Sequence, residues 1–349
     1  MTGHEPLIEI IIPNWNGRDM LEHCLLSLRR QTFSGFCVTV VDNGSRDGSI
    51  ELMERQFPEV RLIKLGYNTG FSVAVNQGIE AAVAPWLLLL NNDMEVAPDC
   101  LEKLCVAVGK YPGYDSFALK MMNFHQREHI DGAGDAVLRG GVGYRLGTME
   151  KDCERYRQDR ETFGACAGAA LYAKRFFAKV GLFDSDFFAY LEDVDLNMRA
   201  RRLGSRCMFI ASALVYHIGS ASSGSKINAL TVRLSTRNNF YVLVKNYSLG
   251  LVVRFFPAIA AYQIAWMLFC LKKGMLIPYF SGLWQVIGAL PRLVGKRRKM
   301  EENSALLPMH QFAALIRSAE REAVHSIMAR RTAAGKGNFL LNLYCALLL

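Results

Sequence analysis

Short apolar segments alternate with helical ones through the first 100 residues, and this order constrains the fold more than any other feature. Strands are expected at 7–12, 37–41, 60–65 and 86–90, with helices at 20–30 and 73–83. Strands that alternate with helices form a mainly parallel sheet with helices on both faces. The sequence therefore predicts an α/β domain, which we place at residues 1–230. An apolar region at 231–300 and a helical tail at 301–349 follow it.

Polar clusters directly follow three of the expected strands. They are 13–17 (PNWNG), 42–45 (DNGS) and 91–93 (NND). Ligands bind at the carboxyl ends of the strands in sheets of this kind. Asn, Asp and Gly also form ordinary turns, which would explain one such loop. Three strand ends of this composition favour a ligand site.

A second candidate region lies at 183–204, with the sequence FDSDFFAYLEDVDLNMRARRLG. It is predicted to join an aromatic loop to an amphipathic helix. Asp193 falls near the start of that helix, where the helix dipole favours a carboxylate, and Gly204 ends it. We expect irregular structure at 110–160 and a last strand at 213–217.

Two uncharged segments explain why 51% of the residues are apolar. They cover 255–271 and 274–291, each at the short end of the ~20 residues that cross a bilayer. Basic residues lie between them, at Lys272 and Lys273, and after them, at 296–299. This pattern favours a hairpin that lies in the cytosolic leaflet of a membrane. Two full crossings and a buried helical layer remain alternatives.

The net charge of +9 indicates anionic partners. The spacing of the nine cysteines includes no CxxC pair. Zinc binding of the common spacing is therefore not expected, and a reducing cytosol suits the cysteines. The first ten residues lack the basic-then-apolar order of a signal peptide. We therefore expect the protein to lie at the cytoplasmic face of the inner (plasma) membrane. Nucleic acid is not an expected partner, because the basic residues lie beside apolar segments without interleaved aromatic residues.

Taken together, the motifs resemble the family 2 nucleotide-sugar glycosyltransferases, whose fold is called GT-A. The matching stretches, in order, are IIPNWNG (11–17), VDNGSRDGSI (41–50), NTGFSVAVNQG (68–78), LLLLNNDMEV (87–96), GAALYAKR (168–175), VGLFDSDFFAYLEDVDLNMRARRLG (180–204) and His217. They are most similar to the rhamnosyltransferase-like branch. The resemblance implies inverting transfer from a UDP- or dTDP-sugar, with dTDP-rhamnose as one candidate, to a saccharide or lipid-linked acceptor in surface-glycan synthesis.

The resemblance also implies which residues bind the nucleotide. They are Pro13, Asn14, Asn16, Asp42, Asn43, Ser45, Asn68, Gly70, Asn76 and Asn92. A carboxylate such as that of Asp42 accepts hydrogen bonds well from a base N–H or a ribose hydroxyl. For Asn68, Gly70 and Asn76, a role in turns or caps is an equal alternative. Asp47 is expected to cap the following helix.

By the same resemblance, the segment 91–93 occupies the place of an Asp-x-Asp metal motif. Here the first position is Asn91, so Asp93 is the one acidic ligand of the motif. His217 matches the position that completes the metal site. Oxygen ligands suit Mg²⁺ or Mn²⁺, and imidazole suits Mn²⁺ better. We therefore expect Mn²⁺ or Mg²⁺ as cofactor.

The resemblance assigns the general base to Asp193. Glu192, Gly168 and Ala169 are expected near the acceptor or donor sugar, and Asp195 is expected to be a helix-start residue. A processive polysaccharide synthase would share these carboxylates, but it usually adds Gln-x-x-Arg-Trp and several long spans. A nucleotide-binding module without catalysis would not need the Glu-Asp pair. A nucleotidyltransferase would carry a glycine-rich basic loop after the first strand.

Overall fold

The computed structural model describes residues 5–219, 227–302 and 305–349. These residues divide into two compact units. The first contains the described residues of Met1–Asp135, Gly147–Phe188 and Arg206–Gly224, and the second those of Ala136–Leu146, Ala189–Ser205 and Ser225–Leu349. The second unit thus combines the helix that carries Asp193 with the C-terminal helices. The domain boundaries expected near 230 and 300 stay a prediction.

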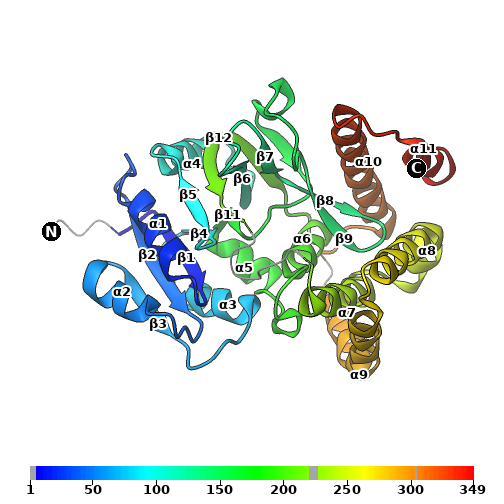
Figure 1. Ribbon diagram of the computed structural model, residues 1–349, viewed down its shortest axis with the longest axis horizontal. Coiled ribbons are helices and arrows are strands. Elements are labelled where there is room, and N and C mark those ends of the chain that lie inside the picture. Colours follow the sequence, from blue (N-terminus) through cyan, green and yellow to red (C-terminus); the bar gives the residue numbers. More distant parts are fainter. Residues whose placement is uncertain (1–4, 220–226, 303–304) are drawn as a thin grey trace. The chain divides into compact units, whose positions relative to one another are not determined.

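The first unit is built on a ten-stranded sheet of order β10-β12-β6-β11-β4-β1-β2-β3, in which β5 also pairs with β12 and β7 with β6. Its strands are β1 (Ile8–Asn14), β2 (Phe36–Asp42), β3 (Arg61–Lys64), β4 (Trp86–Leu90), β5 (Met94–Val96), β6 (Ser116–Asn123), β7 (Ile130–Ala133), β10 (Arg160–Thr162), β11 (Ala169–Ala173) and β12 (Cys207–His217). The first four form a parallel block with β1 between β2 and β4 (Figure 1). β11 runs antiparallel between β4 and β6. The predicted α/β fold is confirmed.

Helices cover both faces of this sheet. They are α1 (Arg18–Leu28), α2 (Ser49–Gln56), α3 (Phe71–Ala81), α4 (Cys100–Lys110) and α5 (Lys174–Val180), with a short 3₁₀ helix η2 (Ser185–Phe187). Ile10 and Ile12 of β1 share one core with Leu21 of α1 and Leu104 of α4. Ile11 points to the opposite face, because successive strand residues alternate. There α3 approaches so closely that a Cβ on Gly78 would lie 2.4 Å from Cγ2 of Ile11.

The expectation of irregular structure at 110–160 was wrong in part. β6 lies inside the sheet, between β11 and β12, and its first seven residues are buried. A strand covered on both faces has no polar and apolar alternation, so it gives no periodic signal. The same stretch contains β7, the two-stranded sheet of β8 (Asp135–Leu138) with β9 (Val142–Arg145), and the 3₁₀ helix η1 (Glu154–Tyr156).

The second unit is mainly helical. Its helices are α6 (Glu192–Arg202), α7 (Ala229–Asn246), α8 (Leu249–Lys272), α9 (Leu276–Glu301), α10 (Met309–Ala333) and α11 (Phe339–Leu348) (Figure 1). α9 packs tightly on α7, where a Cβ on Gly282 would lie 2.6 Å from the carbonyl oxygen of Arg233. A buried ion pair of Arg139 with Glu320 ties the segment between β8 and β9 to α10. Tyr344 of α11 donates to Glu320 at 2.6 Å.

Candidate active site

Side chains from the ends of β1, β2 and β4 meet in one polar cluster of the first unit. Asn92 Nδ2 donates to Asn14 Oδ1 at 2.7 Å. Asn14 Nδ2 in turn lies 3.3 Å from both Asp42 Oδ1 and Ser45 Oγ. Asn14 and Asp42 are each only 1% exposed. The predicted convergence of these strand ends is therefore present, with Asn14 at its centre and the buried carboxylate of Asp42 beside it.

The turn that follows β2 places backbone groups beside this cluster. Asp42 Oδ2 accepts from the backbone N–H of Ser45 at 3.0 Å. Gly44 adopts φ +79°, and a Cβ there would lie 2.6 Å from Cα of Tyr67, so the turn requires glycine. Asn16 joins the loop after β1 to the same turn: its N–H donates to Ser45 Oγ at 2.9 Å, and its Oδ1 accepts from the N–H of Arg46 at 2.8 Å. Pro13 lies on β1 opposite Val41.

The loop before α3 is held by Asn43 and Asn68. Asn43 Oδ1 accepts from the N–H of Thr69 at 2.8 Å, and Asn68 Oδ1 accepts from the N–H of Gly70 at 2.9 Å. Gly70 has φ +86° and packs against Phe188. These side-chain amides stabilise the loop. This is the turn role that the sequence offered as the alternative to nucleotide contact. Whether they also contact a nucleotide stays a prediction.

Asn76 and Asp47 have structural partners. The amide group of Asn76 clamps the backbone of Phe183, donating to its carbonyl at 2.8 Å and accepting from its N–H at 3.0 Å. This arrangement favours a structural role for Asn76. Asp47 accepts from the N–H of Ser49, the first residue of α2, at 3.1 Å, and from that of Arg18, at the start of α1, at 2.9 Å.

The two predicted metal ligands are direct neighbours in the first unit. His217 Nε2 lies 3.2 Å from Asp93 Oδ2, and His217 Nδ1 lies 2.8 Å from Asp131 Oδ2. Burial lowers the pKa of His217, but its hydrogen bonds and charge interactions with Asp131 and Asp93 outweigh burial and raise that pKa to about 9.

The chemistry of this group fits a divalent cation. Oδ1 of Asp93 is buried and has no hydrogen-bond partner among the described residues. An unpartnered carboxylate oxygen beside an imidazole nitrogen offers an oxygen ligand and a nitrogen ligand to one ion, as Mn²⁺ accepts. Asp93 and His217 therefore fit the cofactor expected from the sequence.

Gly168 and Ala169 lie beside the end of β4. Ala169 pairs with Leu90, and the carbonyl of Gly168 accepts from the N–H of Asn91 at 2.9 Å. A Cβ on Gly168 would lie 3.0 Å from Nδ2 of Asn91. A small residue is thus needed at position 168, next to Asn91, which replaces the usual first acid of the metal motif.

In the second unit, α6 begins with Glu192 and Asp193, as predicted. The two residues before it, Tyr190 and Leu191, have φ values of +71° and +66°. Such strain in non-glycine residues persists only where the surroundings enforce it, and it clusters at functional sites. Here Asn238 of α7 donates to the carbonyls of Ala189 and Tyr190, at 2.8 and 2.7 Å.

Glu192 and Asp193 differ in their surroundings. Asp193 is half-buried, and its Oδ1 accepts from the N–H of Val194 at 2.8 Å. Burial, and then the neighbouring charge of Asp193, raise the pKa of Glu192 to about 8. Its Oε2 has no hydrogen-bond partner among the described residues. Glu192 is therefore a neutral carboxylic acid at pH 7, adjacent to the carboxyl group assigned as general base.

Asp195 lies in the first turn of α6, as expected, but it does more than start the helix. It is fully buried, with Lys245 Nζ 2.8 Å from its Oδ1 and Arg199 Nε 3.0 Å from its Oδ2. Asn246 donates to Oδ1 at 2.9 Å. The carboxylate joins α6 to α7, so the simple helix-start interpretation was incomplete.

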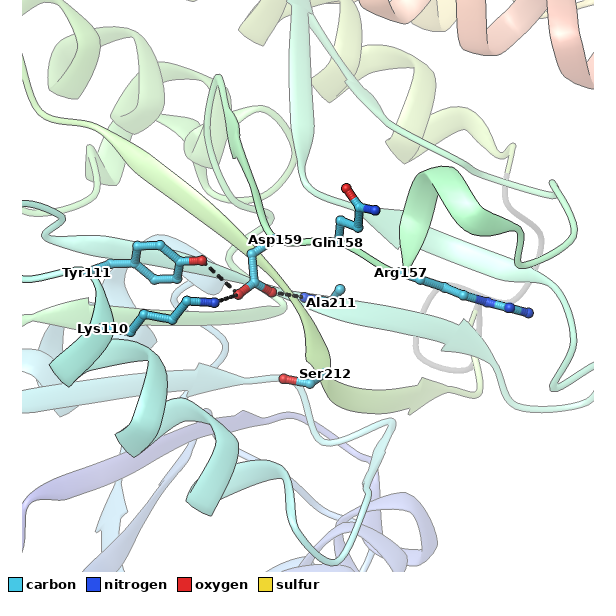
Figure 2. A pocket seen from close by; sticks show the side chains of 7 residues that line it. All are labelled: Lys110, Tyr111, Arg157, Gln158, Asp159, Ala211 and Ser212. Carbon is cyan, nitrogen blue, oxygen red and sulfur yellow. Dashed lines mark hydrogen bonds and ion pairs between the residues drawn. The ribbon is translucent and has the colours of Figure 1, made fainter.

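A separate hollow of about 450 Å³ contains none of the predicted site residues. Figure 2 shows its lining of Lys110, Tyr111, Arg157, Gln158, Asp159, Ala211 and Ser212. Asp159 accepts from Lys110 Nζ, Tyr111 OH and the N–H of Ala211, at 3.2, 2.9 and 3.0 Å. The carboxylate thus fastens the end of α4 to β12, which is a structural role.

Comparison with known proteins identifies the fold and family. The model of "Glycosyl transferase family 2" matches residues 9–181. The chain belongs to glycosyltransferase family 2. The crystal structure of S. aureus TarS 1-349 in complex with UDP-GlcNAc has a TM-score of 0.53 at 16% identity, covering 94% of this chain and 92% of that one. This likeness confirms the GT-A fold class.

Two relatives of this glycosyltransferase come from mycobacteria. An "N-acetylglucosaminyl-diphospho-decaprenol L-rhamnosyltransferase" of Mycobacterium tuberculosis (strain CDC 1551 / Oshkosh) is 28% identical over 239 residues, which are 62% of this chain and 78% of that protein. A "PGL/p-HBAD biosynthesis glycosyltransferase" of Mycobacterium bovis (strain BCG / Pasteur 1173P2) is 26% identical over 227 residues, covering 62% and 80%. The similarity to the rhamnosyltransferase-like branch is confirmed.

Sequence reasoning missed two residues of the glycosyltransferase's candidate site. Asp131 lies on β7 in a glycine-containing segment, IDGA. In such a segment the sequence alone predicts that an acidic residue belongs to a turn. Asn238 lies in α7, and it is fully buried. A buried amide in an otherwise helical pattern is a usable signal, because such a group needs partners. For Asp131 the sequence offers no comparable signal.

Proposed function

We propose that this glycosyltransferase transfers a sugar from a UDP- or dTDP-sugar to a saccharide or lipid-linked acceptor in surface-glycan synthesis, with inversion at the anomeric carbon. The observation that carries this proposal is the buried cluster of Asn14, Asp42, Ser45 and Asn92 at three strand ends. The name of the Mycobacterium tuberculosis relative, a diphospho-decaprenol L-rhamnosyltransferase, supports a lipid-linked acceptor and keeps dTDP-rhamnose as one candidate donor. The UDP-GlcNAc complex of TarS supports a nucleotide-sugar donor.

Asp42 would bind the nucleoside. Its two oxygens each accept one internal hydrogen bond, from Asn14 and from the N–H of Ser45. An ionised carboxylate has about four acceptor positions, so it retains capacity for a base N–H or a ribose hydroxyl. Gly44 lets the backbone of the same turn come close to the ligand.

Asp93 and His217 would hold Mn²⁺ or Mg²⁺, with Asp93 Oδ1 and His217 Nε2 as the ligand atoms. When bound, the cation supplies Lewis-acid stabilisation of the charge on the departing diphosphate. The unpartnered Oδ1 of Asp93 supports this assignment.

Asp193 would act as general base. Its carboxylate takes the proton of the acceptor hydroxyl while the hydroxyl oxygen forms a bond to the anomeric carbon. The bond from that carbon to the diphosphate oxygen breaks, and the nucleoside diphosphate leaves with the electron pair. Attack from the side opposite the leaving group inverts the configuration. Neutral Glu192 is able to donate a hydrogen bond to the acceptor, because its carboxyl group retains a proton at pH 7.

The helices α8 and α9 would place the enzyme on the cytoplasmic face of the inner (plasma) membrane. Large apolar side chains are exposed along both, including Val253 and Phe256 on α8 and Ile277 and Trp284 on α9. Of the described helices, only α8 is long and apolar enough to cross a membrane, and 22% of its apolar window is buried. This exposure argues against a buried helical layer. Basic residues at both ends of the pair suit an anionic lipid surface.

A donor screen tests the proposed function. The purified enzyme is incubated with UDP-, dTDP- and GDP-sugars, with Mn²⁺ or Mg²⁺, and release of nucleoside diphosphate is measured without acceptor. Slow hydrolysis of one UDP- or dTDP-sugar is the expected result. Hydrolysis of GDP-sugars alone, or of none of the donors, would overturn the proposal.

A further inference from the structure

We propose that Asp131 is the positioning residue of the metal site: its carboxylate fixes the imidazole of His217 so that Nε2 faces Asp93 and the cation. The inference rests on the proposed metal dependence and adds a residue that the metal motif itself does not contain. It concerns three side chains of the first unit, on β7, on the loop after β4 and at the end of β12.

The geometry distinguishes the two carboxylates around His217. Asp131 Oδ2 lies 2.8 Å from Nδ1, whereas Asp93 Oδ2 lies 3.2 Å from Nε2. Each ring nitrogen thus has its own carboxylate, at opposite sides of the imidazole. A metal-binding histidine commonly uses one nitrogen for the ion and donates the other N–H to a carboxylate, which fixes the tautomer and the orientation of the ring. Asp131 occupies the second of these positions.

The strands that carry these groups hold the arrangement rigidly. β7 pairs with β6, and β6 pairs with β12 up to its last residue, His217, opposite Asn123. The backbone carbonyl of Asp131 accepts from Thr148 Oγ1 at 3.0 Å. The side chains of Asp131 and His217 are only 17% and 14% exposed. Their contact is therefore set by the sheet and is largely shielded from water.

This position has a chemical consequence for the metal site. The motif carries Asn91 where a first acid is usual, so Asp93 alone supplies a negative ligand from it. A carboxylate on Nδ1 makes the imidazole a more basic ligand and adds negative charge near the ion. Asp131 thereby compensates in part for the missing acid without contacting the cation.

The test measures Mn²⁺ binding to the purified protein by electron paramagnetic resonance. Mn²⁺ is titrated alone and together with UDP or dTDP into the parent and into Asp131→Asn, Asp131→Glu, Asp93→Ala and His217→Ala. Loss of such an outer carboxylate typically weakens metal binding 10–100-fold. Asp131→Asn should show that loss, and Asp131→Glu should recover part of the affinity. The coupling of a histidine nitrogen to bound Mn²⁺ should be present in the parent and weakened in Asp131→Asn.

Glu95→Gln is the matched control. Glu95 contacts another imidazole, that of His23, at 2.9 Å, and its substitution removes the same charge from neighbouring β5. It should change Mn²⁺ affinity less than threefold. Circular dichroism checks that each variant is folded. If Asp131→Asn is not folded, the Mn²⁺ affinity of Asp131→Glu is compared with that of the parent in its place.

The outcomes separate the two proposals. If Asp93→Ala and His217→Ala lose Mn²⁺ while a folded Asp131→Asn binds like the parent, the role of Asp131 is wrong and the metal site stands. If the parent binds no Mn²⁺ under any of the conditions, the proposed metal dependence is overturned and the inference with it.

Discussion

Lys245 Nζ lies 2.8 Å from Oδ1 of Asp195, and both side chains are buried. The contact joins α6, whose first two residues are Glu192 and Asp193, to α7. Asn238, seven residues before Lys245 in α7, holds the strained loop before α6. α7 therefore fixes both the loop before the candidate base and the helix after it.

Substitution of Asp195 should accordingly destabilise the fold. In Asp195→Asn the buried ammonium of Lys245 loses the carboxylate that lies 2.8 Å away, and breaking a buried ion pair in this way costs about 3–5 kcal/mol. Urea unfolding measures the change. Glu59→Gln, which removes an exposed pair with Arg29, is the control and should cost at most about 1 kcal/mol. A loss of similar size in both variants would contradict the structural role of Asp195.

The raised pKa of Glu192 predicts a pH-dependent stability. Below its ordinary pKa of 4.5 the carboxyl is protonated in both the folded and unfolded states. Between about pH 4.5 and about 8 the folded state binds one more proton than the unfolded state, so the free energy of unfolding falls as pH rises. Above about pH 8 the carboxyl is ionised in both states, and the stability that Glu192 contributes at low pH is lost. Glu192→Gln stays neutral and lacks this decline. Thermal unfolding from pH 5.5 to 9 should show the variant gaining stability relative to the parent, and parallel profiles would refute the assignment.

The sequence predicted the elements whose pattern is local. β1, β2, β3, β4, α1 and α3 lie within a few residues of their expected positions, because each shows its own periodicity or a bounding polar turn. The gathering of Asn14, Asp42 and Asn92 followed from the rule that parallel strands end at one edge. β6 was missed, because a strand buried on both faces has no alternation. Asp131 and Lys245 were missed because their partners, His217 and Asp195, lie 86 and 50 residues away in sequence.

Replacing the acidic residue of the metal motif should separate metal binding from folding. Asp93→Ala should abolish the divalent-cation dependence of nucleotide binding and leave the fold intact, since Oδ2 contacts His217, the other proposed ligand, and Oδ1 has no partner among the described residues. Asn91→Asp restores the usual first acid and should tighten Mn²⁺ binding. Calorimetry with UDP or dTDP, with and without EDTA, measures both effects. A parent affinity unchanged by EDTA would rule out a role for the cation in donor binding.

Exposed apolar residues of α8 and α9 should hold the enzyme on anionic vesicles. Trp284 is 75% exposed, and burying a side chain of this size in lipid contributes about 1.5–3 kcal/mol. Trp284→Glu should therefore weaken binding to phosphatidylglycerol-containing vesicles tenfold or more in a sedimentation assay. Val106→Glu, at a 62% exposed site on α4 of the first unit, is the control and should bind like the parent. Equal loss in both variants, or full release of the parent by salt alone, would contradict hydrophobic anchoring.

Turnover of Asp193→Asn tests the central claim most directly. The variant keeps the size of the side chain and one acceptor oxygen, but its amide cannot take a proton from the acceptor. Removing a general base typically costs about 10²–10⁴-fold in rate. Release of nucleoside diphosphate from the accepted donor should fall by that factor, while the affinity for the nucleotide stays within about twofold of the parent. A folded Asp193→Asn enzyme that turns over at close to the parent rate would contradict the account.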